Sequence, residues 1–444
     1  MTISFTQEMI ALFTGILVII LLTAKYHVHA FFALIIACFV TGLGVQLPPA
    51  NLVGIIKDGF GNIMKSLGLI IVLGTTLGVL LEHTGSTRVM ANYILKKVGD
   101  KNAAFALSLT GFIVGLPVFC DSGFIVLSGL NKSLSKKTGI SIVVTSVSLA
   151  TGLYAVHCLI PPHPGAAAAA ATIGADYGKL ILYGIIIALP AMLVGHWWAV
   201  YAGKKITAID EDKADEIVTD PTVQPSVLKA FMPVIIPIIL IAVRSFFMTG
   251  NPSNNSWINI ILVLGDPVIA LSAGVLLAFA TKATWKKKMV SILLQESVEK
   301  AGGILVIIGA GGTFGAVLAA TNMGSHLGEV FALNSLGILF PFLVTFLLKT
   351  AQGSSTVAII TAASIVLPLL PQLGLDSDNG KLLAVLSMGA GSMMISHAND
   401  AYFWVITKFS GLDIKTTLKV YSVATALMGL TTLLMVYILS LILL

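Results

Sequence analysis

Ionisable side chains inside apolar sequence are the first candidates for chemistry in this chain. Asp121 stands in a polar segment, residues 117–123, while His157 and His163 belong to a proline-rich segment, residues 157–165. A charge is costly in lipid, so an ionisable residue in such a run marks a functional site by default. Desolvation favours the neutral form of a carboxylate at bilayer depth, which suits it to taking up and releasing a proton. We therefore predict that Asp121 carries a proton, with His157 and His163 as candidate partners.

A similar pattern recurs about 235 residues further along the chain. There Gly353, Ser354, Ser355 and Thr356 follow one apolar run, and residues 396–400 interrupt another. We call residues 117–123 and 352–356 the first and second tips, and residues 157–165 and 396–400 the first and second breaks. Two interrupted apolar segments in corresponding halves of a chain point to the binding site of a membrane transporter.

The tips and breaks supply all the candidate site residues. The predicted substrate-binding residues are Asp121, Ser122, Gly123, His157, His163, Gly353, Ser354, Ser355, Thr356, His397 and Asn399. The candidate proton-coupling residues are Asp121, His157, His163, His397 and Asp400. We expect no cofactor besides the proton as coupling ion, and no metal, because the first pair of histidines has no further ligands at usable spacing.

These residues also have structural interpretations. Asp121, Ser122 and Gly123 form a helix N-cap signature, and Ser354, Ser355 and Thr356 supply hydroxyls at a helix start. The histidines could hydrogen-bond the backbone of a broken helix instead of handling protons. Capping and binding are compatible, because the exposed amides at a helix N-terminus bind anions.

Composition places the whole chain in a membrane. Of its 444 residues, 57% are hydrophobic and 10% are charged, and the mean hydropathy is +0.97. Such a chain leaves too little polar surface for a soluble domain, and its long apolar runs exclude an outer-membrane barrel. The net charge of +6 reflects loop lysines facing lipid head groups and the cytoplasm, and is no argument for nucleic acid. The cysteines Cys38, Cys120 and Cys158 all lie in apolar sequence and predict no disulfide.

The apolar runs predict an all-α polytopic membrane protein made of two inverted-topology repeats. The first repeat, residues 1–202, has three spans, a re-entrant hairpin at 102–131, a broken span at 140–175 and a span at 180–202. A hydrophilic cytoplasmic linker follows at 203–229. The second repeat, residues 230–444, has a hairpin at 332–371, a broken span at 382–409 and a last span at 418–443. We also expect a surface helix at 51–65 before a span at 67–81, its counterpart at 289–300, and an unbroken span at 258–281.

Loop charge and glycine spacing favour the inverted arrangement. Lys132, Lys136 and Lys137 border the first hairpin, whereas Asp376 and Asp378 border the second. This change of sign is what hairpins opening to opposite faces of the membrane would produce. The glycine and serine positions that correspond between the halves are Gly74 with Gly311, Gly78 with Gly315, Ser148 with Ser387 and Gly152 with Gly391. The alternative for each hairpin is two full spans around a kink.

Three function classes are compatible with polar groups in the membrane. A secondary transporter explains the paired tips and breaks, a channel needs no such pairing, and an intramembrane enzyme could use His and Asp. The sequence contains no Walker A motif, zinc-protease motif or Gly-x-Ser-x-Gly elbow, which disfavours ATP-driven transport and intramembrane hydrolysis.

The segments 117–123, 157–165, 351–358 and 396–404 together resemble the gluconate permease family of bacterial proton symporters. The resemblance covers nearly the whole chain. It implies multi-pass insertion in the bacterial inner membrane and proton-coupled uptake of gluconate or a related sugar acid. It also implies a homodimer in which a transport domain moves against a scaffold. The family includes D-serine carriers, so a small anionic substrate is expected but its identity stays open.

Overall fold

The computed structural model describes residues 5–99, 102–204, 224–248, 256–282, 284–321, 336–397 and 399–444. Most of the predicted linker 203–229 and the first residues of the predicted hairpin 332–371 lie outside these ranges. Within them the chain forms helices and no strand. The helices of the first half are α1 (Phe5–Ile20), α2 (Ala30–Gly44), α3 (Pro49–His83), α4 (Ser86–Val98), α5 (Ala103–Gly115), α6 (Cys120–Thr138), α7 (Ile142–Leu159), α8 (Pro164–Ile173) and α9 (Tyr177–Gly203).

The second half continues the all-helical architecture. Its helices are α10 (Val227–Met248), α11 (Ser256–Leu264), α12 (Pro267–Ala280), α13 (Lys287–Ala320), α15 (Leu339–Gln352), α16 (Ser355–Val366), α17 (Asp378–Met393), α18 (Ala401–Ser410), α19 (Ile414–Thr417) and α20 (Val423–Leu443). By length and composition, 7 helical stretches among the described residues could cross a membrane, or up to 8 if the bent pair α11–α12 is one span. The prediction of an all-α polytopic membrane protein is confirmed.

Three predicted boundaries were wrong. The expected surface helix 51–65 and span 67–81 form a single helix, α3, of 35 residues, and the piece 289–300 is likewise the first part of α13. Lys57 and Lys65 lie on the exposed face of α3, while Gly59 on the opposite face contacts the backbone of α13. The amphipathic pattern therefore reflects the burial of one face of α3 against α13.

The expected span 258–281 is instead bent by 64° between α11 and α12. Asp266 begins α12 by accepting a hydrogen bond from the amide of Val268, at 3.0 Å. The same carboxylate forms an ion pair with Arg244 of α10, at 2.6 Å. A capping aspartate at this position starts a new helix and thus explains the bend.

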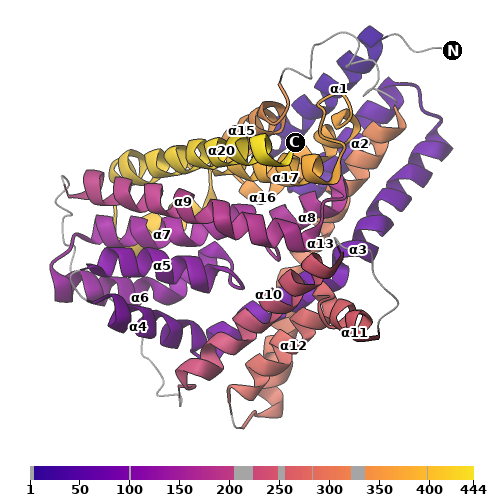
Figure 1. Ribbon diagram of the computed structural model, residues 1–444. Helices are drawn as coiled ribbons and strands as arrows, with labels where there is room; N and C mark the ends of the chain where they lie inside the picture. The colour runs from indigo at the N-terminus through magenta and orange to yellow at the C-terminus, as the bar shows by residue number, and fades with distance from the viewer. Residues whose placement is uncertain are drawn as a thin grey trace.

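The helices form two groups (Figure 1). The long helices α3 and α13 lie side by side, with α1, α2 and α10–α12 around them. The other group contains the short helices α5, α6, α15 and α16, together with α7, α9, α17 and α20. Helix α8 packs on α16 and α3 and so joins the two groups.

Corresponding glycines mediate similar helix contacts in the two halves. A Cβ added at Gly152 of α7 would meet the backbone of Ser108 and Phe112 in α5. One added at Gly391 of α17 would meet the backbone of Phe342 and Phe346 in α15. Small residues allow such close approach between membrane helices. The inverted topology also requires the hairpins to open to opposite faces, and it stays a prediction.

Candidate binding site

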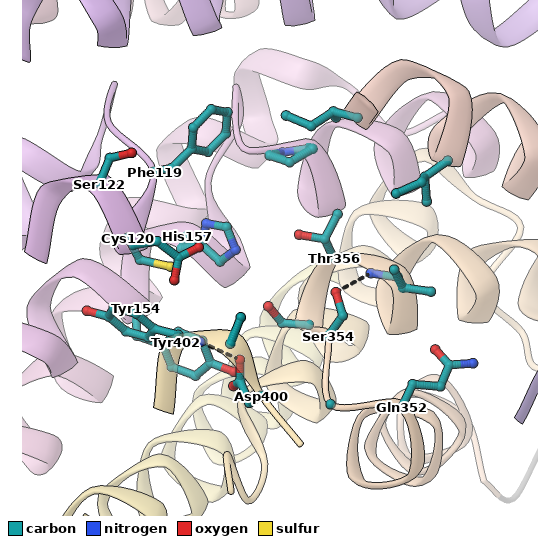
Figure 2. Close-up of a pocket in the computed structure, with 18 of the residues that line it drawn as sticks. Phe119, Cys120, Ser122, Tyr154, His157, Gln352, Ser354, Thr356, Asp400 and Tyr402 are labelled. Carbon is teal, nitrogen blue, oxygen red and sulfur yellow. Dashed lines mark hydrogen bonds between the residues drawn. The ribbon is translucent and has the colours of Figure 1, made fainter. Parts of the chain in front are cut away.

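A cavity of about 470 Å³ lies between the two helix groups, where several helices begin (Figure 2). Figure 2 shows Cys120 and His157 on one side of this cavity, with Ser354 and Thr356 across from them. The lining residues come from both tips, both breaks, neighbouring residues of α7, α16 and α18, and α13: Phe119, Cys120, Asp121, Ser122, Tyr154, His157, Pro164, Lys300, Ile304, Ile307, Gln352, Gly353, Ser354, Ser355, Thr356, Val357, Asn399, Asp400, Ala401 and Tyr402. The structure thus brings together segments more than 200 residues apart in the sequence.

Four helix N-termini contribute to this lining. Helix α6 begins at Cys120, α8 at Pro164, α16 at Ser355 and α18 at Ala401, and all four residues border the cavity or adjoin residues that do. The first amides of a helix have no intrahelical partner, and they carry the positive end of the helix dipole. Several such termini around one cavity make it suited to an anion.

The four N-termini differ in their caps. The Ser354 hydroxyl accepts from the amide of Val357 at 3.3 Å, and Asp400 accepts from the amide of Tyr402 at 3.0 Å. The residues before α6 and α8, Phe119 and His163, provide no side-chain cap. Because α8 starts with a proline, α6 retains the most amides for a ligand.

Several polar atoms at the cavity are buried and have no hydrogen-bond partner in the part of the chain that the structure describes. They are Oδ1 of Asp121, Nδ1 of His157, and both Oε1 and Nε2 of Gln352. Buried polar atoms are normally paired, because an unsatisfied one costs about 1–3 kcal/mol. A ligand that carries both hydroxyls and a carboxylate could satisfy all of them.

Three of the predicted site residues instead contact carbonyl groups at the ends of α5 and α15. His163 Nε2 lies 2.6 Å from the carbonyl oxygen of Gly115, at the end of α5. His397 Nε2 lies 3.2 Å from the carbonyl oxygen of Thr350, near the end of α15, and Asn399 Nδ2 donates to the same oxygen at 2.9 Å. These contacts satisfy carbonyl groups that a helix C-terminus leaves open.

The predicted site residues are thus only partly brought together. Those that line the cavity are Asp121, Ser122, His157, Gly353, Ser354, Ser355, Thr356, Asn399 and Asp400. Gly123, His163 and His397 lie outside its lining. A Cβ at Gly123 would meet the side chain of Leu153, which shows that this glycine serves the packing of α6 on α7. Among the described residues, no three His, Cys, Asp or Glu side chains are grouped so as to hold a metal ion.

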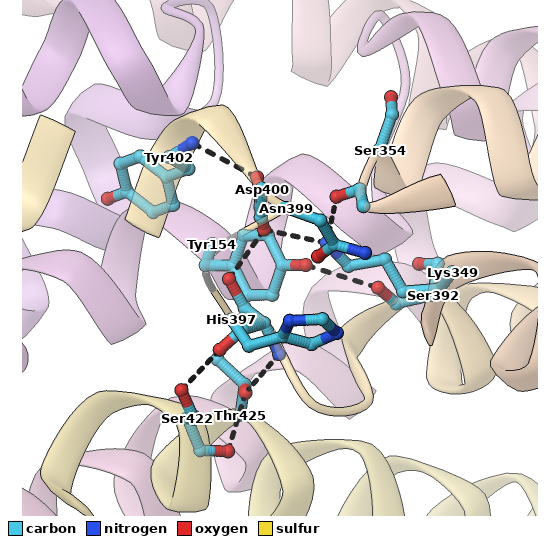
Figure 3. A network of polar contacts seen from close by, with 12 residues as sticks. Tyr154, Lys349, Ser354, Ser392, His397, Asn399, Asp400, Tyr402, Ser422 and Thr425 are labelled. Carbon is cyan, nitrogen blue, oxygen red and sulfur yellow. Dashed lines mark hydrogen bonds and ion pairs between the residues drawn. The ribbon is translucent and has the colours of Figure 1, made fainter. Parts of the chain in front are cut away.

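Lys349 is fully buried beside the cavity and was not among the predicted site residues (Figure 3). Its ammonium donates to Asp400 Oδ2 at 2.6 Å and to the carbonyl oxygen of Gly353. The available signal was a single lysine at the end of the apolar run 339–352, next to the second tip. Gln352, Tyr154, Tyr402 and Lys300 were also missed as lining residues.

The fold and cavity together define a multi-pass membrane protein with a polar binding site at helix breaks, a class typical of secondary transporters. The family model described as GntP family permease matches residues 7–442. The chain therefore belongs to the GntP permease family, in agreement with the resemblance found in the sequence. It is a transport protein of the bacterial inner membrane and not an enzyme.

Full-length relatives agree with this assignment. The chain is 34% identical to a gluconate permease of Pseudomonas aeruginosa over 441 residues, covering 98% of this chain and 97% of the relative. It is 30% identical to the D-serine transporter DsdX of Escherichia coli O6:H1, covering 93% and 94% of the two chains. The Neisseria gonorrhoeae MtrF structure matches with a TM-score of 0.67 at 16% identity, over 94% of this chain and 96% of that one. This last likeness supports the fold alone.

Proposed function

We propose that the protein takes up gluconate or a related sugar acid together with protons, and that the cavity of Figure 2 binds the substrate. The observation that carries this proposal is the convergence of helix N-termini and unpaired polar atoms in one cavity. The relatives named as gluconate permeases and transporters support the choice of substrate. A sugar acid offers a carboxylate for the amides and several hydroxyls for the polar side chains.

The N-terminus of α6 is the preferred place for the substrate carboxylate. The residue before this helix, Phe119, has no side-chain group that could cap it. The amides of Cys120, Asp121 and Ser122 are therefore open to a ligand. Gln352 and His157 would then bond the sugar hydroxyls through their unpaired atoms. Ser355 and Thr356, at the start of α16, add hydroxyls from the opposite wall.

Asp121 is the proposed proton carrier. Of the two acids that line the cavity, Asp400 is paired with Lys349, whereas Oδ1 of Asp121 has no partner among the described residues. An unpaired carboxylate next to a bound anion is unfavourable while charged, so substrate binding would promote its protonation. Proton and substrate would then be bound together. His157, His163, His397 and Asp400 remain candidate partners for this proton.

Movement of the site would follow from the two hairpins. In this proposal α5–α6 and α15–α16 are re-entrant, they open to opposite faces of the membrane, and they carry the cavity past α3 and α13. The homodimer that the family resemblance implies would hold this scaffold in place. Crosslinking of the purified protein in lipid, followed by mass measurement, would test for the dimer.

D-serine is the alternative substrate within the same site. The unpaired Oδ1 of Asp121 would suit an ammonium group as well as a proton, and one relative is named as a D-serine transporter. The two substrates differ in whether Asp121 must be charged when they bind. D-serine would require the charged form, whereas a sugar acid would favour the neutral one.

Uptake by proteoliposomes tests the proposal. The purified protein should accumulate gluconate or a related aldonate or hexuronate when the outside is more acidic, and D-serine should not compete. Accumulation without a proton gradient would argue against coupling, and uptake of D-serine alone would select the alternative. Single-channel currents would indicate a channel, and chemically altered substrate would indicate an enzyme.

A further inference from the structure

The buried ammonium of Lys349 is held by oxygen atoms from two separate segments (Figure 3). One is the backbone carbonyl of Gly353 in the second tip, and the other is Oδ2 of Asp400 in the second break. The lysine side chain is 0% exposed and that of Asp400 is 9% exposed. The contact joins the end of α15 to the start of α18, across 51 residues of sequence.

The oxygen atoms around the ammonium are themselves fixed. Oδ2 of Asp400 also accepts from the Ser396 hydroxyl at 2.5 Å, and its Oδ1 caps α18 through the amide of Tyr402. The Ser396 amide donates to the hydroxyl of Thr425 in α20 at 3.0 Å, and the Ser422 hydroxyl donates to the Ser396 carbonyl. The site is therefore built by α15, the second break and α20 before any ligand arrives.

Carbonyl, carboxylate and hydroxyl oxygens are the ligands that hard cations prefer. In transporters with broken helices, unwound carbonyls and half-helix C-termini coordinate the coupling cation. We propose that Lys349 is a tethered cation, a positioning residue whose ammonium fills a monovalent-cation site and fixes the second tip to the second break. The part of the cavity wall formed by the second tip and the second break is then assembled without a bound metal ion.

The first half of the chain makes the corresponding contact without charge. His163 precedes α8 as Asp400 precedes α18, and it contacts the carbonyl of Gly115 at the end of α5. An imidazole and a carbonyl oxygen need no cation between them. A carboxylate and a carbonyl oxygen would repel each other, and an unpaired Asp400 would also repel an anionic substrate. The ammonium removes both repulsions.

A merely structural ion pair would behave differently from a tethered cation when the lysine is shortened. Lys349→Ala leaves the oxygen ligands in place and opens the space that the side chain filled. The site should then accept a free cation of suitable size. The test therefore measures the thermal midpoint of purified Lys349→Ala protein in choline chloride, in sodium chloride and in propylammonium chloride, at equal ionic strength.

We expect a lowered midpoint in choline and its recovery in sodium or propylammonium. Substrate exchange in proteoliposomes should fall by about 100-fold or more in choline, the size expected when a buried charge loses its partner, and should recover with the same cations. The exchange measurement rests on the proposed function, whereas the midpoint needs no substrate. If wild-type protein exchanges no sugar acid, only the proposed function fails.

Two controls separate charge from packing. The wild type and the doubly neutral variant Lys349→Met with Asp400→Asn should show no cation-dependent change in midpoint, because neither has an empty cation site. This doubly neutral variant should fold but exchange substrate slowly, because no charged contact then joins the second tip to the second break. The proposal is overturned if Lys349→Ala has the wild-type thermal midpoint in choline, or if neither sodium nor propylammonium raises a lowered midpoint. It is also overturned if the doubly neutral variant exchanges substrate at the wild-type rate.

Discussion

The two acids of the cavity occupy similar places and have different partners. Asp121 is in the first turn of α6, and Asp400 is the residue before α18. Asp400 accepts hydrogen bonds from Lys349, Ser396 and the amide of Tyr402, so both of its oxygens have partners. Asp121 has one oxygen without a partner in the described part of the chain. That free oxygen is the feature on which the proposed proton-carrying role of Asp121 rests.

The first prediction concerns the variant Asp121→Asn. It keeps the size of the side chain and fixes it in a neutral form, so the coupled proton has no carrier. Accumulation driven by a proton gradient should be abolished, while substrate exchange at equal concentrations should persist. Both are measured in proteoliposomes with labelled substrate. Accumulation with a normal dependence on pH would show that Asp121 does not carry the coupled proton, and the proton would then have to use a histidine or Asp400.

The second prediction concerns Gln352, whose amide oxygen and nitrogen are both unpaired at the cavity. Gln352→Ala should weaken substrate binding by about 1–3 kcal/mol, because it removes groups that the bound substrate would satisfy. The measurement is the substrate concentration that gives half-maximal exchange. Gln295→Ala on the exposed face of α13 is the matched control and should leave this value unchanged. Equal values for both variants would place the substrate away from the second tip.

Local sequence was sufficient to find Asp121, His157 and the serines of the second tip. Each is polar and lies next to a helix break in apolar sequence, and this combination can be recognised without a structure. Lys349 was missed because it lies at the end of an apolar run, where a lysine is usually at the membrane surface. Its partner Asp400 is 51 residues away, and only the packing of α15 on α17 brings them together.

At the scale of helices, glycine contacts fix how the hairpin helices pack. A Cβ at Gly391 would lie 3.0 Å from the amide nitrogen of Phe346 and would overlap the carbonyl oxygen of Phe342. Backbone atoms in a helix cannot move aside as a flexible side chain would. Helices α15 and α17 would have to separate, and Lys349 would be drawn away from Asp400.

The third prediction is that Gly391→Ala lowers the stability of the protein by about 1–3 kcal/mol, the usual cost of overpacking. Thermal unfolding of the purified variant in detergent measures it. The control is Gly302→Ala on α13, where a Cβ meets nothing within 4 Å. That variant should be stabilised slightly, because alanine favours a helix more than glycine does. A stable Gly391→Ala protein would mean that α15 is free to shift along α17.

The number and type of helices could be predicted from hydropathy, but several of their ends could not. Helix α3 is continuous because Gly59 and Gly61 do not break a helix that packs closely on α13. The bend at Asp266 depends on an ion pair with Arg244, which is in a different helix. Such boundaries are set by tertiary contacts, and a local reading of charge and polarity does not reveal them.

At the scale of the whole molecule, the fourth prediction concerns topology. The segments 131–139 and 371–381 should lie on opposite sides of the membrane, because lysines border the first hairpin and acids border the second. In the structure the first segment is the end of α6, and the second leads into the first turn of α17. Single cysteines introduced into each segment should react with an impermeant reagent from opposite sides of oriented vesicles. Labelling of both segments from one side would contradict the inverted repeat.

The two halves meet the long helices at different levels. On α3, Gly78 lies against the carbonyl oxygen of Pro117, in the first tip itself. On α13, the corresponding Gly315 lies against Ser364, well past the start of α16. The two hairpins thus contact their long helices at different distances from their tips.

The last prediction tests whether this arrangement must change during transport. A Cβ built at Gly315 lies 3.3 Å from Cβ of Ser364, close to the separation of about 3.5–4.5 Å found in disulfides. In a background without Cys38, Cys120 and Cys158, the pair Gly315→Cys and Ser364→Cys should form a disulfide under oxidation. Substrate exchange should then stop and return on reduction.

The control pair for this crosslink is Gly303→Cys with Ser364→Cys. Position 303 is 12 residues earlier on α13 than position 315, about 18 Å along the helix axis, so no disulfide should form in the present state. Exchange by this control should survive oxidation. If the crosslinked 315–364 protein exchanges substrate at the normal rate, then α16 does not move against α13 during transport. The cavity would in that case open by movement of α6 and α18 alone.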